Sequence, residues 1–157
     1  MAYRLRAFIA ERRQLEALAA RLQGARVIDL TGSLGILPLV DGVESMLASG
    51  GKPPFGGLKV SEALAAAAAA ASGDGPLAYA EADYQRDKDF QAAVVWAAGK
   101  VVYGPRLDAT AWDPREAGDS GRPVNGALRL LGVSAAGFDD EWDAVGLARH
   151  IDTSAWT

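Results

Sequence analysis

The fold is decided by residues 77–103, in which three apolar runs are separated by two turns: LAYAEADY (77–84), QRDKD (85–89), FQAAVVWA (90–97), AG (98–99) and KVVY (100–103). The runs are rich in aromatic and β-branched residues, which favour strands. The turns are short enough to join neighbouring antiparallel strands. The stretch therefore predicts a three-stranded antiparallel meander.

Residues 3–40 add further strands and one helix. Apolar residues at every second position of 3–9 predict a strand with one buried face, and apolar residues at helical spacing predict a helix over 11–23. Two short apolar runs, 27–30 and 34–40, predict two more strands. The second lies at a sheet edge or ends at Pro38, because proline has no N–H to donate to a neighbouring strand.

Four further segments predict helices. Asp41 caps a helix that runs through residue 47, and Ser61 caps an alanine-rich helix over 62–71 that we expect to lie close against a sheet. Shorter helices are expected over 124–131 and from 138 to about 147, with a loop over 104–123. The pattern predicts a single α+β domain, residues 1–157, in which helices pack on one face of an antiparallel sheet.

The composition excludes several classes of function. The chain has 157 residues, a formal charge of −4 and no cysteine, so it forms no disulfide and has no thiolate ligand or nucleophile. Its acidity argues against a nucleic-acid partner, because phosphate contacts need clustered lysine and arginine. The N-terminal apolar run is too short and too charged for a signal peptide, and no run is long enough to cross a membrane. We therefore expect a cytoplasmic protein without a membrane partner.

A first acidic cluster lies in the meander. Glu81 and Asp83 share one face of a strand, and Asp87 and Asp89 follow in the turn. Carboxylates suit Mg²⁺ or Ca²⁺, but basic residues alternate with these acids and the glycine and final glutamate of an EF-hand loop are missing. We expect no metal and no cofactor here. The cluster predicts either an ordinary solvated turn or an acidic surface that meets a basic protein.

A second acidic cluster surrounds an aromatic residue. Asp140, Glu141 and Asp143 flank Trp142 where the last helix begins. Acidic residues stabilise a helix N-terminus, which accounts for the cluster without any partner. An aromatic anchor among carboxylates is equally typical of a binding hot spot. Trp112, in the predicted loop, either packs on the core or is offered to a partner.

No set of residues predicts catalysis. The run GDSGRP (118–123) is similar to the nucleophile segment of trypsin-like proteases, but a histidine must precede that serine, and His150 follows it. His150, near the end of a helix, either supplies a favourable charge there or acts as a base. The glycine spacings match no phosphate-binding fingerprint. We therefore expect no enzymatic activity.

Several runs resemble segments of small bacterial α+β proteins; these are residues 80–84, 91–96, 99–105, 125–133 and 140–150. In those proteins the turn after the tyrosine is usually glycine-rich, whereas here residues 85–90 read QRDKDF. The resemblance implies a bacterial source. Compact, acidic, cysteine-free α+β proteins of this kind are similar in character to immunity proteins, which neutralise a toxin delivered by a neighbouring cell.

We therefore expect a protein-binding module, and within that class an immunity protein, or antitoxin, that occludes the active site of a cognate toxin with a basic surface. The expected partner-binding residues are Glu81, Asp83, Asp87, Asp89, Trp112, Asp140, Glu141 and Asp143. One alternative is a small hydrolase, which requires His150 to meet Glu81 or Asp83 in a pocket. Another is an oligomerising scaffold module that uses a sheet edge or the alanine-rich helix.

Overall fold

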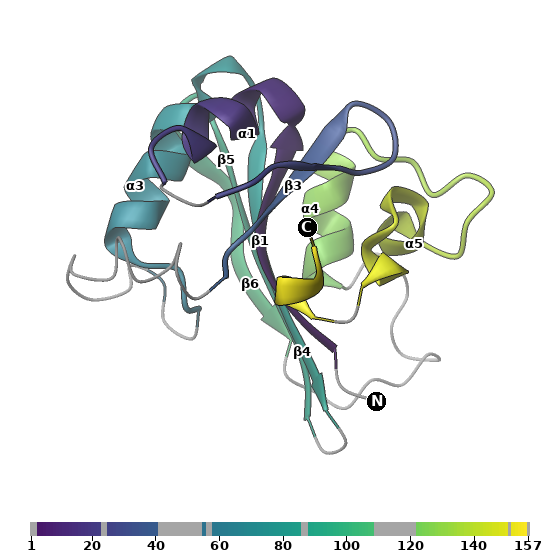
Figure 1. Ribbon diagram of the computed structural model, residues 1–157. Coiled ribbons are helices and arrows are strands. Elements are labelled where there is room, and N and C mark those ends of the chain that lie inside the picture. Colours follow the sequence, from purple (N-terminus) through teal and green to yellow (C-terminus); the bar gives the residue numbers. More distant parts are fainter. Residues whose placement is uncertain are drawn as a thin grey trace.

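A six-stranded antiparallel sheet, in the order β2-β3-β1-β4-β5-β6, forms the centre of the molecule (Figure 1). The computed structural model describes residues 3–22, 25–40, 55, 58–85, 88–108, 122–150 and 152–156, with the backbone alone at 85, 88 and 89. The predicted α+β class with an antiparallel sheet is confirmed. The helix predicted from Asp41 lies outside the described residues.

The strands and helices have the following bounds. The strands are β1 Tyr3–Glu11, β2 Ile28–Asp29, β3 Leu34–Pro38, β4 Leu77–Gln85, β5 Lys88–Ala97 and β6 Lys100–Asp108. The helices are α1 Arg12–Ala19, α3 Glu62–Ala71, α4 Pro123–Leu130 and α5 Glu141–Val145, with 3₁₀ turns η1 Ser72–Asp74, η3 Leu147–Arg149 and η4 Thr153–Ala155. Within these ranges no helix combines the length and apolar character that crossing a bilayer needs.

Helices cover both faces of the sheet, so the prediction that they share one face is wrong (Figure 1). On one face α1 and α3 pack against Phe8, Tyr79 and Val94. On the other face α4, α5 and the C-terminal segment pack against side chains such as Leu5 and Ala80. The physical reason is that β1 and β4 lie inside the sheet, where apolar residues occur at consecutive positions and both faces must be buried.

The predicted meander is present as β4, β5 and β6, and both of its outer strands are longer than predicted. Gln85 pairs with Lys88, so β5 also begins before residue 90, where the sequence pattern places its start. The predicted loop begins too early, because residues 104–108 belong to β6. The sequence pattern did not predict this part of β6, because Gly104 and Pro105 are unfavourable inside a strand. The sheet accommodates the interruption with irregular pairing between β5 and β6.

The alanine-rich helix α3 packs closely on the sheet and on α1, as predicted. The hydroxyl oxygen of Ser61 accepts a hydrogen bond of 3.1 Å from the Leu64 N–H and caps the helix. Leu64, Ala67 and Ala68 are buried in the same core cluster as the α1 leucines. Because alanine side chains are small, the helix axis can approach its neighbours closely.

Helix α4 is fixed to the opposite face of the sheet by polar side chains of two strands. The amide oxygen of Gln91 accepts from the Val124 N–H at 3.2 Å, and the Tyr103 hydroxyl donates to the Pro123 carbonyl at 3.1 Å. The first bond satisfies an N–H group of the first helical turn that has no partner within the helix, and the second attaches the same turn to β6. The helix predicted over 124–131 is thus confirmed within one residue at each end.

The C-terminal segment lies against β1 at the place where β3 has ended. The Thr153 hydroxyl accepts from the Arg6 N–H and donates to the Arg4 carbonyl, each at 3.2 Å. One side chain thereby satisfies two backbone groups of β1 that a strand would otherwise bind. Trp156 is only 3% exposed and anchors the segment in the core beside α4 and α5.

Candidate functional site

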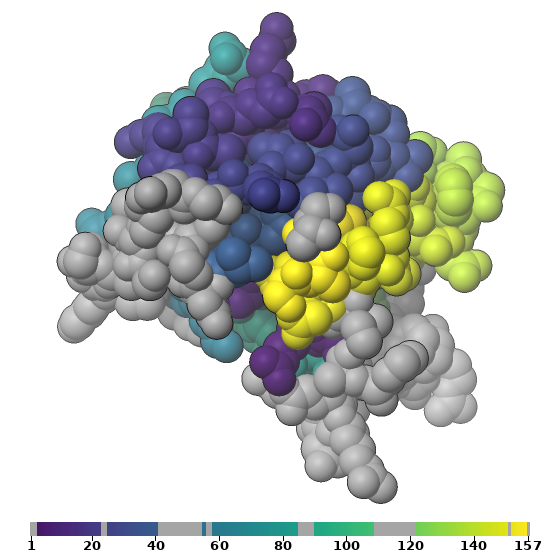
Figure 2. Space-filling view, in the orientation of Figure 1, coloured from purple at the N-terminus to yellow at the C-terminus, as the bar shows by residue number. Residues whose placement is uncertain are grey.

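A cavity of about 760 Å³ opens where the ends of β1 and β4 extend beyond α3. Its described lining residues are Arg4, Leu5, Arg6, Leu39, Val40, Lys59, Glu81, Ala82, Asp83, Phe90, Asp152, Thr153 and Ser154. In Figure 2 the C-terminal segment, in yellow, borders a recess in which atoms of the purple and teal strands are visible. Six separate segments of the chain therefore contribute to one concave site.

The inner part of the cavity is a polar network around the backbone of Lys59. Arg6 and Glu81 are direct partners in the β1–β4 register. The carboxylate of Glu81 accepts hydrogen bonds from the Lys59 N–H and from the Tyr79 hydroxyl, and the Arg6 guanidinium donates to the Lys59 carbonyl at 3.2 Å. Glu81 is 3% exposed. The network holds the segment that leads into α3 against the sheet.

The outer part of the cavity carries charges of both signs. Arg4 and Asp83 are the next β1–β4 pair on the same face of the sheet, and Phe90 lies opposite Asp83 on β5. The carboxylate of Asp152 accepts from the Ser154 N–H at 3.0 Å and from the Ser154 hydroxyl at 2.8 Å. These two hydrogen bonds, with a smaller contribution from nearby Arg4, lower the pKa of Asp152.

Two tyrosines near the cavity, the buried Tyr79 and the half-buried Tyr3, have phenols with a raised pKa. Burial raises the pKa of Tyr79 well above its ordinary value, and the neighbouring Glu81 carboxylate raises it further. Burial likewise raises the pKa of Tyr3, with a second contribution from Tyr84. Both phenols therefore stay neutral in the folded protein at physiological pH.

The structure changes the interpretation of the first acidic cluster. The expectation of an exposed acidic face at Glu81 is wrong, because its carboxylate is needed inside to satisfy the Lys59 N–H and the Tyr79 hydroxyl. Asp83 does share its face and lines the cavity, half-buried. Asp87, the Asp89 side chain and Trp112 lie outside the described residues.

In the second acidic cluster, Asp140 and Glu141 stabilise the fold, whereas Asp143 lies on the surface. Asp140 caps α5 by accepting from the Asp143 N–H at 2.8 Å. Glu141, expected on the surface, is buried and forms an ion pair of 2.6 Å with Arg129 of α4. Trp142 is half-buried, with its ring centroid 5.1 Å from that of Tyr3. Of the three acids predicted to bind a partner here, Asp143 alone is fully exposed.

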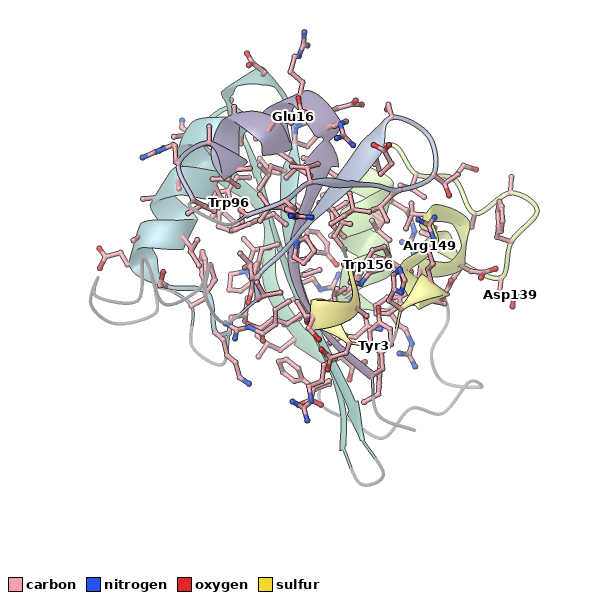
Figure 3. The ribbon with its side chains drawn as sticks, viewed as in Figure 1. Tyr3, Glu16, Trp96, Asp139, Arg149 and Trp156 are labelled. Atoms are coloured by element: carbon pink, nitrogen blue, oxygen red, sulfur yellow. The ribbon has the colours of Figure 1, made fainter. Side chains whose placement is uncertain are left out.

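An aromatic side chain that sequence reasoning missed lies beside these acids. Phe138 is 52% exposed, and Asp139 and Asp143 are exposed next to it in sequence and at the start of α5. We call Phe138, Asp139 and Asp143 the Phe138 surface. Figure 3 shows Asp139 at the outer margin of the molecule, pointing away from the body. The sequence feature that could have indicated this side chain is a large apolar residue, Phe138, placed between Gly137 and two aspartates where a helix begins.

Asn125 holds the Phe138 surface in place. This side chain is 1% exposed, and its two amide atoms bind the start of α5. Its nitrogen donates to the Asp140 carboxylate at 3.2 Å, and its oxygen accepts from the Trp142 N–H at 2.9 Å. Together with the Arg129–Glu141 ion pair, this fixes α5 on α4. The surface is therefore presented by a rigid support.

The structure does not supply the arrangement that the hydrolase alternative requires. His150 is not among the residues that line the cavity with Glu81 and Asp83. Its ring instead meets the ring of Trp156 edge-on, with the centroids 4.7 Å apart. Ser120 lies outside the described residues. In the described part of the chain no three acidic or histidine side chains converge in a way that could hold a metal ion.

The two surfaces named in the scaffold alternative differ. The apolar side of α3 is used inside the molecule, as its buried Ala65 and Ala68 show. The edge strand β6 does present exposed Val102 and Leu107. Its pairing with β5 is irregular and it contains Pro105, two features that protect natural sheet edges from further pairing.

Comparison of the chain with known proteins gives no match to any protein-family model, to any curated protein or to any solved structure. The expected likeness to small bacterial proteins and to immunity proteins thus stays a prediction.

Proposed function

We propose that this chain is a protein-binding module that recognises a basic partner through the Phe138 surface. The observation that carries the proposal is the exposed aromatic ring of Phe138, which is followed in the sequence by the exposed acids Asp139 and Asp143. A large apolar side chain that is half in water gains free energy when a partner covers it. It is the kind of anchor around which binding energy concentrates.

Asp139 and Asp143 give this anchor its selectivity. Complementary charges raise the rate of encounter and disfavour wrong partners more than they raise affinity. The net charge of −4 and the isoelectric point near 5.0 act in the same direction, because they attract a basic protein over the whole approach.

Within this class we propose the role of an immunity protein that acts in the cytoplasm and blocks the active site of a toxin. Its support is the resemblance of the C-terminal half to small bacterial proteins, together with the acidic, cysteine-free composition. A toxin that cleaves or modifies nucleic acid has a basic active site, which an acidic surface can fill.

Co-expression with the protein of the neighbouring upstream reading frame tests the proposal. We expect that protein to arrest growth, the present chain to restore growth, and the two to purify as a complex. Asp139→Lys with Asp143→Lys should weaken the complex more than tenfold at low salt. Asp74→Lys, which changes an exposed acid elsewhere, is the matched control. Unchanged binding by the double variant would exclude the Phe138 surface, and a neighbour that neither binds nor harms the cell would exclude the immunity role.

A further inference from the structure

The edge strand β6 carries much of the exposed apolar surface. In the described part of the chain five large hydrophobic side chains are exposed, and three of them, Val101, Val102 and Leu107, lie on this one strand. Their exposed fractions are 41%, 54% and 45%. Among the described strands β6 is the last in the sheet order, so its outer edge faces away from β5. An apolar strand at a sheet edge is suited to pair with a further strand.

Two of these apolar side chains lie on the face of the sheet that α3 covers. Val101 pairs with Trp96 of β5. Leu107 pairs with Ala92, which is buried with Trp96 in the core cluster beneath α1 and α3. Because directly opposite residues of antiparallel strands point to the same face, Val101 and Leu107 share that face.

Two side chains of opposite charge, the first and the last of β6, lie on the other face. Lys100 pairs with Ala97 of β5, and Asp108 pairs with Gln91. Ala97 and Gln91 are an even number of positions apart on β5, so their side chains share a face, and Gln91 binds α4. Lys100 is exposed and Asp108 is half-buried. The α4 face of the strand therefore begins with a cation and ends with an acid.

The apolar pair and the charged pair have the same centre. Residues 101 and 107 lie three positions before and after Gly104, and residues 100 and 108 lie four positions before and after it. A two-fold axis at Gly104 therefore places Val101 of one copy opposite Leu107 of a second copy. On the other face it places Lys100 opposite Asp108. Since each contact occurs twice about the axis, β6 is complementary to an antiparallel copy of itself.

The irregular middle of β6 restricts this pairing to one register. Gly104 and Pro105 interrupt the strand and protect it against an arbitrary neighbouring strand. With the axis at Gly104, the two interruptions face each other. Residues 100–101 and 107–108, which keep direct partners on β5, then pair across the two copies. Any shifted register places an interruption against one of these paired stretches.

We infer that β6 is an interface with a second copy of this chain, in which the two β6 strands pair antiparallel about Gly104. The covered valine and leucine side chains supply the affinity, and the charged pairs select the orientation, because parallel strands in the same register would bring like charges together. Asp108 already has an interaction within its own chain, and a carboxylate with two oxygens can accept from Lys100 as well. The interface goes beyond the proposed binding of a basic partner and uses none of the residues of the Phe138 surface.

Engineered disulfides test the register, because the chain has no cysteine of its own. In the variant with both Val101→Cys and Leu107→Cys, each cysteine lies directly opposite a cysteine of the second copy, close enough for a disulfide. Mild oxidation should convert most of this variant into a covalent dimer. Val101→Cys alone places its two cysteines about 15 Å or more apart in the dimer and should give little. Equal cross-linking of the single and double variants, or none in either, overturns the inference.

Sedimentation velocity measures the strength of the association. We expect the wild-type chain to form a dimer whose fraction rises with concentration. Leu107→Lys should weaken dimerisation more than tenfold, because it removes an apolar contact and places a charge opposite Val101 at two positions of the dimer. Leu130→Lys changes an equally exposed side chain at the end of α4 and should have no effect. A wild-type chain that stays monomeric up to about 1 mM, or an equal loss in the two variants, overturns the inference.

Exchange of the two charges tests the orientation. Lys100→Asp and Asp108→Lys each bring like charges together at two positions, so each should weaken dimerisation about tenfold. The variant with both changes restores opposite charges across the interface and should recover most of the affinity. Far-UV circular dichroism of each variant checks that the chain is folded. Losses that simply add in the double variant would exclude the pairing about Gly104.

Discussion

Arg6 and Glu81 lie directly opposite each other on β1 and β4, and the two side chains bind the two backbone groups of one residue, Lys59. This relationship explains why an acidic residue in the middle of the meander is buried. It joins the segment before α3 to the sheet without an additional strand. The same pair forms the inner wall of the cavity, so the stability of the fold and the shape of the site depend on it together.

Replacement of Glu81 by alanine should lower the free energy of unfolding by about 3 kcal/mol, because it leaves the Lys59 N–H and the buried Tyr79 hydroxyl without this acceptor. Glu81→Gln retains an oxygen acceptor and should cost less. Urea denaturation measures both, with the exposed Asp74→Ala as the control. Equal stability of Glu81→Ala and the control would show that the network contributes nothing.

The buried phenols of Tyr3 and Tyr79 should make the fold sensitive to alkali. Their pKa values are raised above the ordinary value of 10.0, so ionisation favours the unfolded chain. This contribution to stability is complete below pH 10 and is lost as the pH rises from there toward the folded-state pKa values. Thermal denaturation between pH 8 and 11 should show a smaller loss of stability for Tyr3→Phe and Tyr79→Phe than for the wild-type chain. Identical pH dependence in all three would contradict this explanation.

The turn between β5 and β6 contains an alanine in an unfavourable conformation. Ala98 has φ +51° and Gly99 has φ +80°, as a two-residue hairpin of type I′ requires. Asparagine tolerates this region better than alanine, so Ala98→Asn should stabilise the protein by about 0.5–1 kcal/mol. The expected gain is an increase in the midpoint of urea denaturation with an unchanged slope. A decrease would mean that the turn adopts a different conformation in solution.

Gly126 leaves room for the Tyr103 side chain beneath α4. A Cβ atom at this position would overlap the Tyr103 hydroxyl and lie 2.9 Å from its Cζ atom. Gly126→Ala should therefore destabilise the fold by about 1–3 kcal/mol. Adding Tyr103→Phe should recover part of the loss, because the overlapping oxygen is removed. Gly73→Ala, where no atom lies within 4 Å, is the neutral control. Strictly additive effects would exclude the predicted clash.

Sequence patterns predicted the elements that depend on local chemistry. The cap at Ser61 predicted α3, and the apolar runs and short turns in 77–103 predicted the meander, because short-range preferences and burial agree there. The missing N–H of Pro38 predicted that the strand over 34–40 either lies at a sheet edge or ends there, and β3 ends at Pro38. By contrast, β6 continues through Gly104 and Pro105, and only pairing with β5 reveals it.

The candidate sites depended on contacts that local patterns do not contain. Arg6 and Glu81 are 75 positions apart in the sequence (81 minus 6), and only the β1–β4 register brings them together. The sequence indicated a surface acid at Glu141, because its ion-pair partner Arg129 belongs to another helix. Phe138 was overlooked because an apolar residue is expected to be buried, and its exposure is visible only in the folded chain.

The most direct test of the proposed role is calorimetric titration of the toxin partner with three forms of the chain: wild type, Phe138→Leu and Phe138→Ala. If Phe138 is the anchor, the alanine variant should bind at least about tenfold more weakly and the leucine variant should lie between it and the wild type. Equal affinity of all three forms would contradict the account, because the partner would then be held by some other part of the molecule.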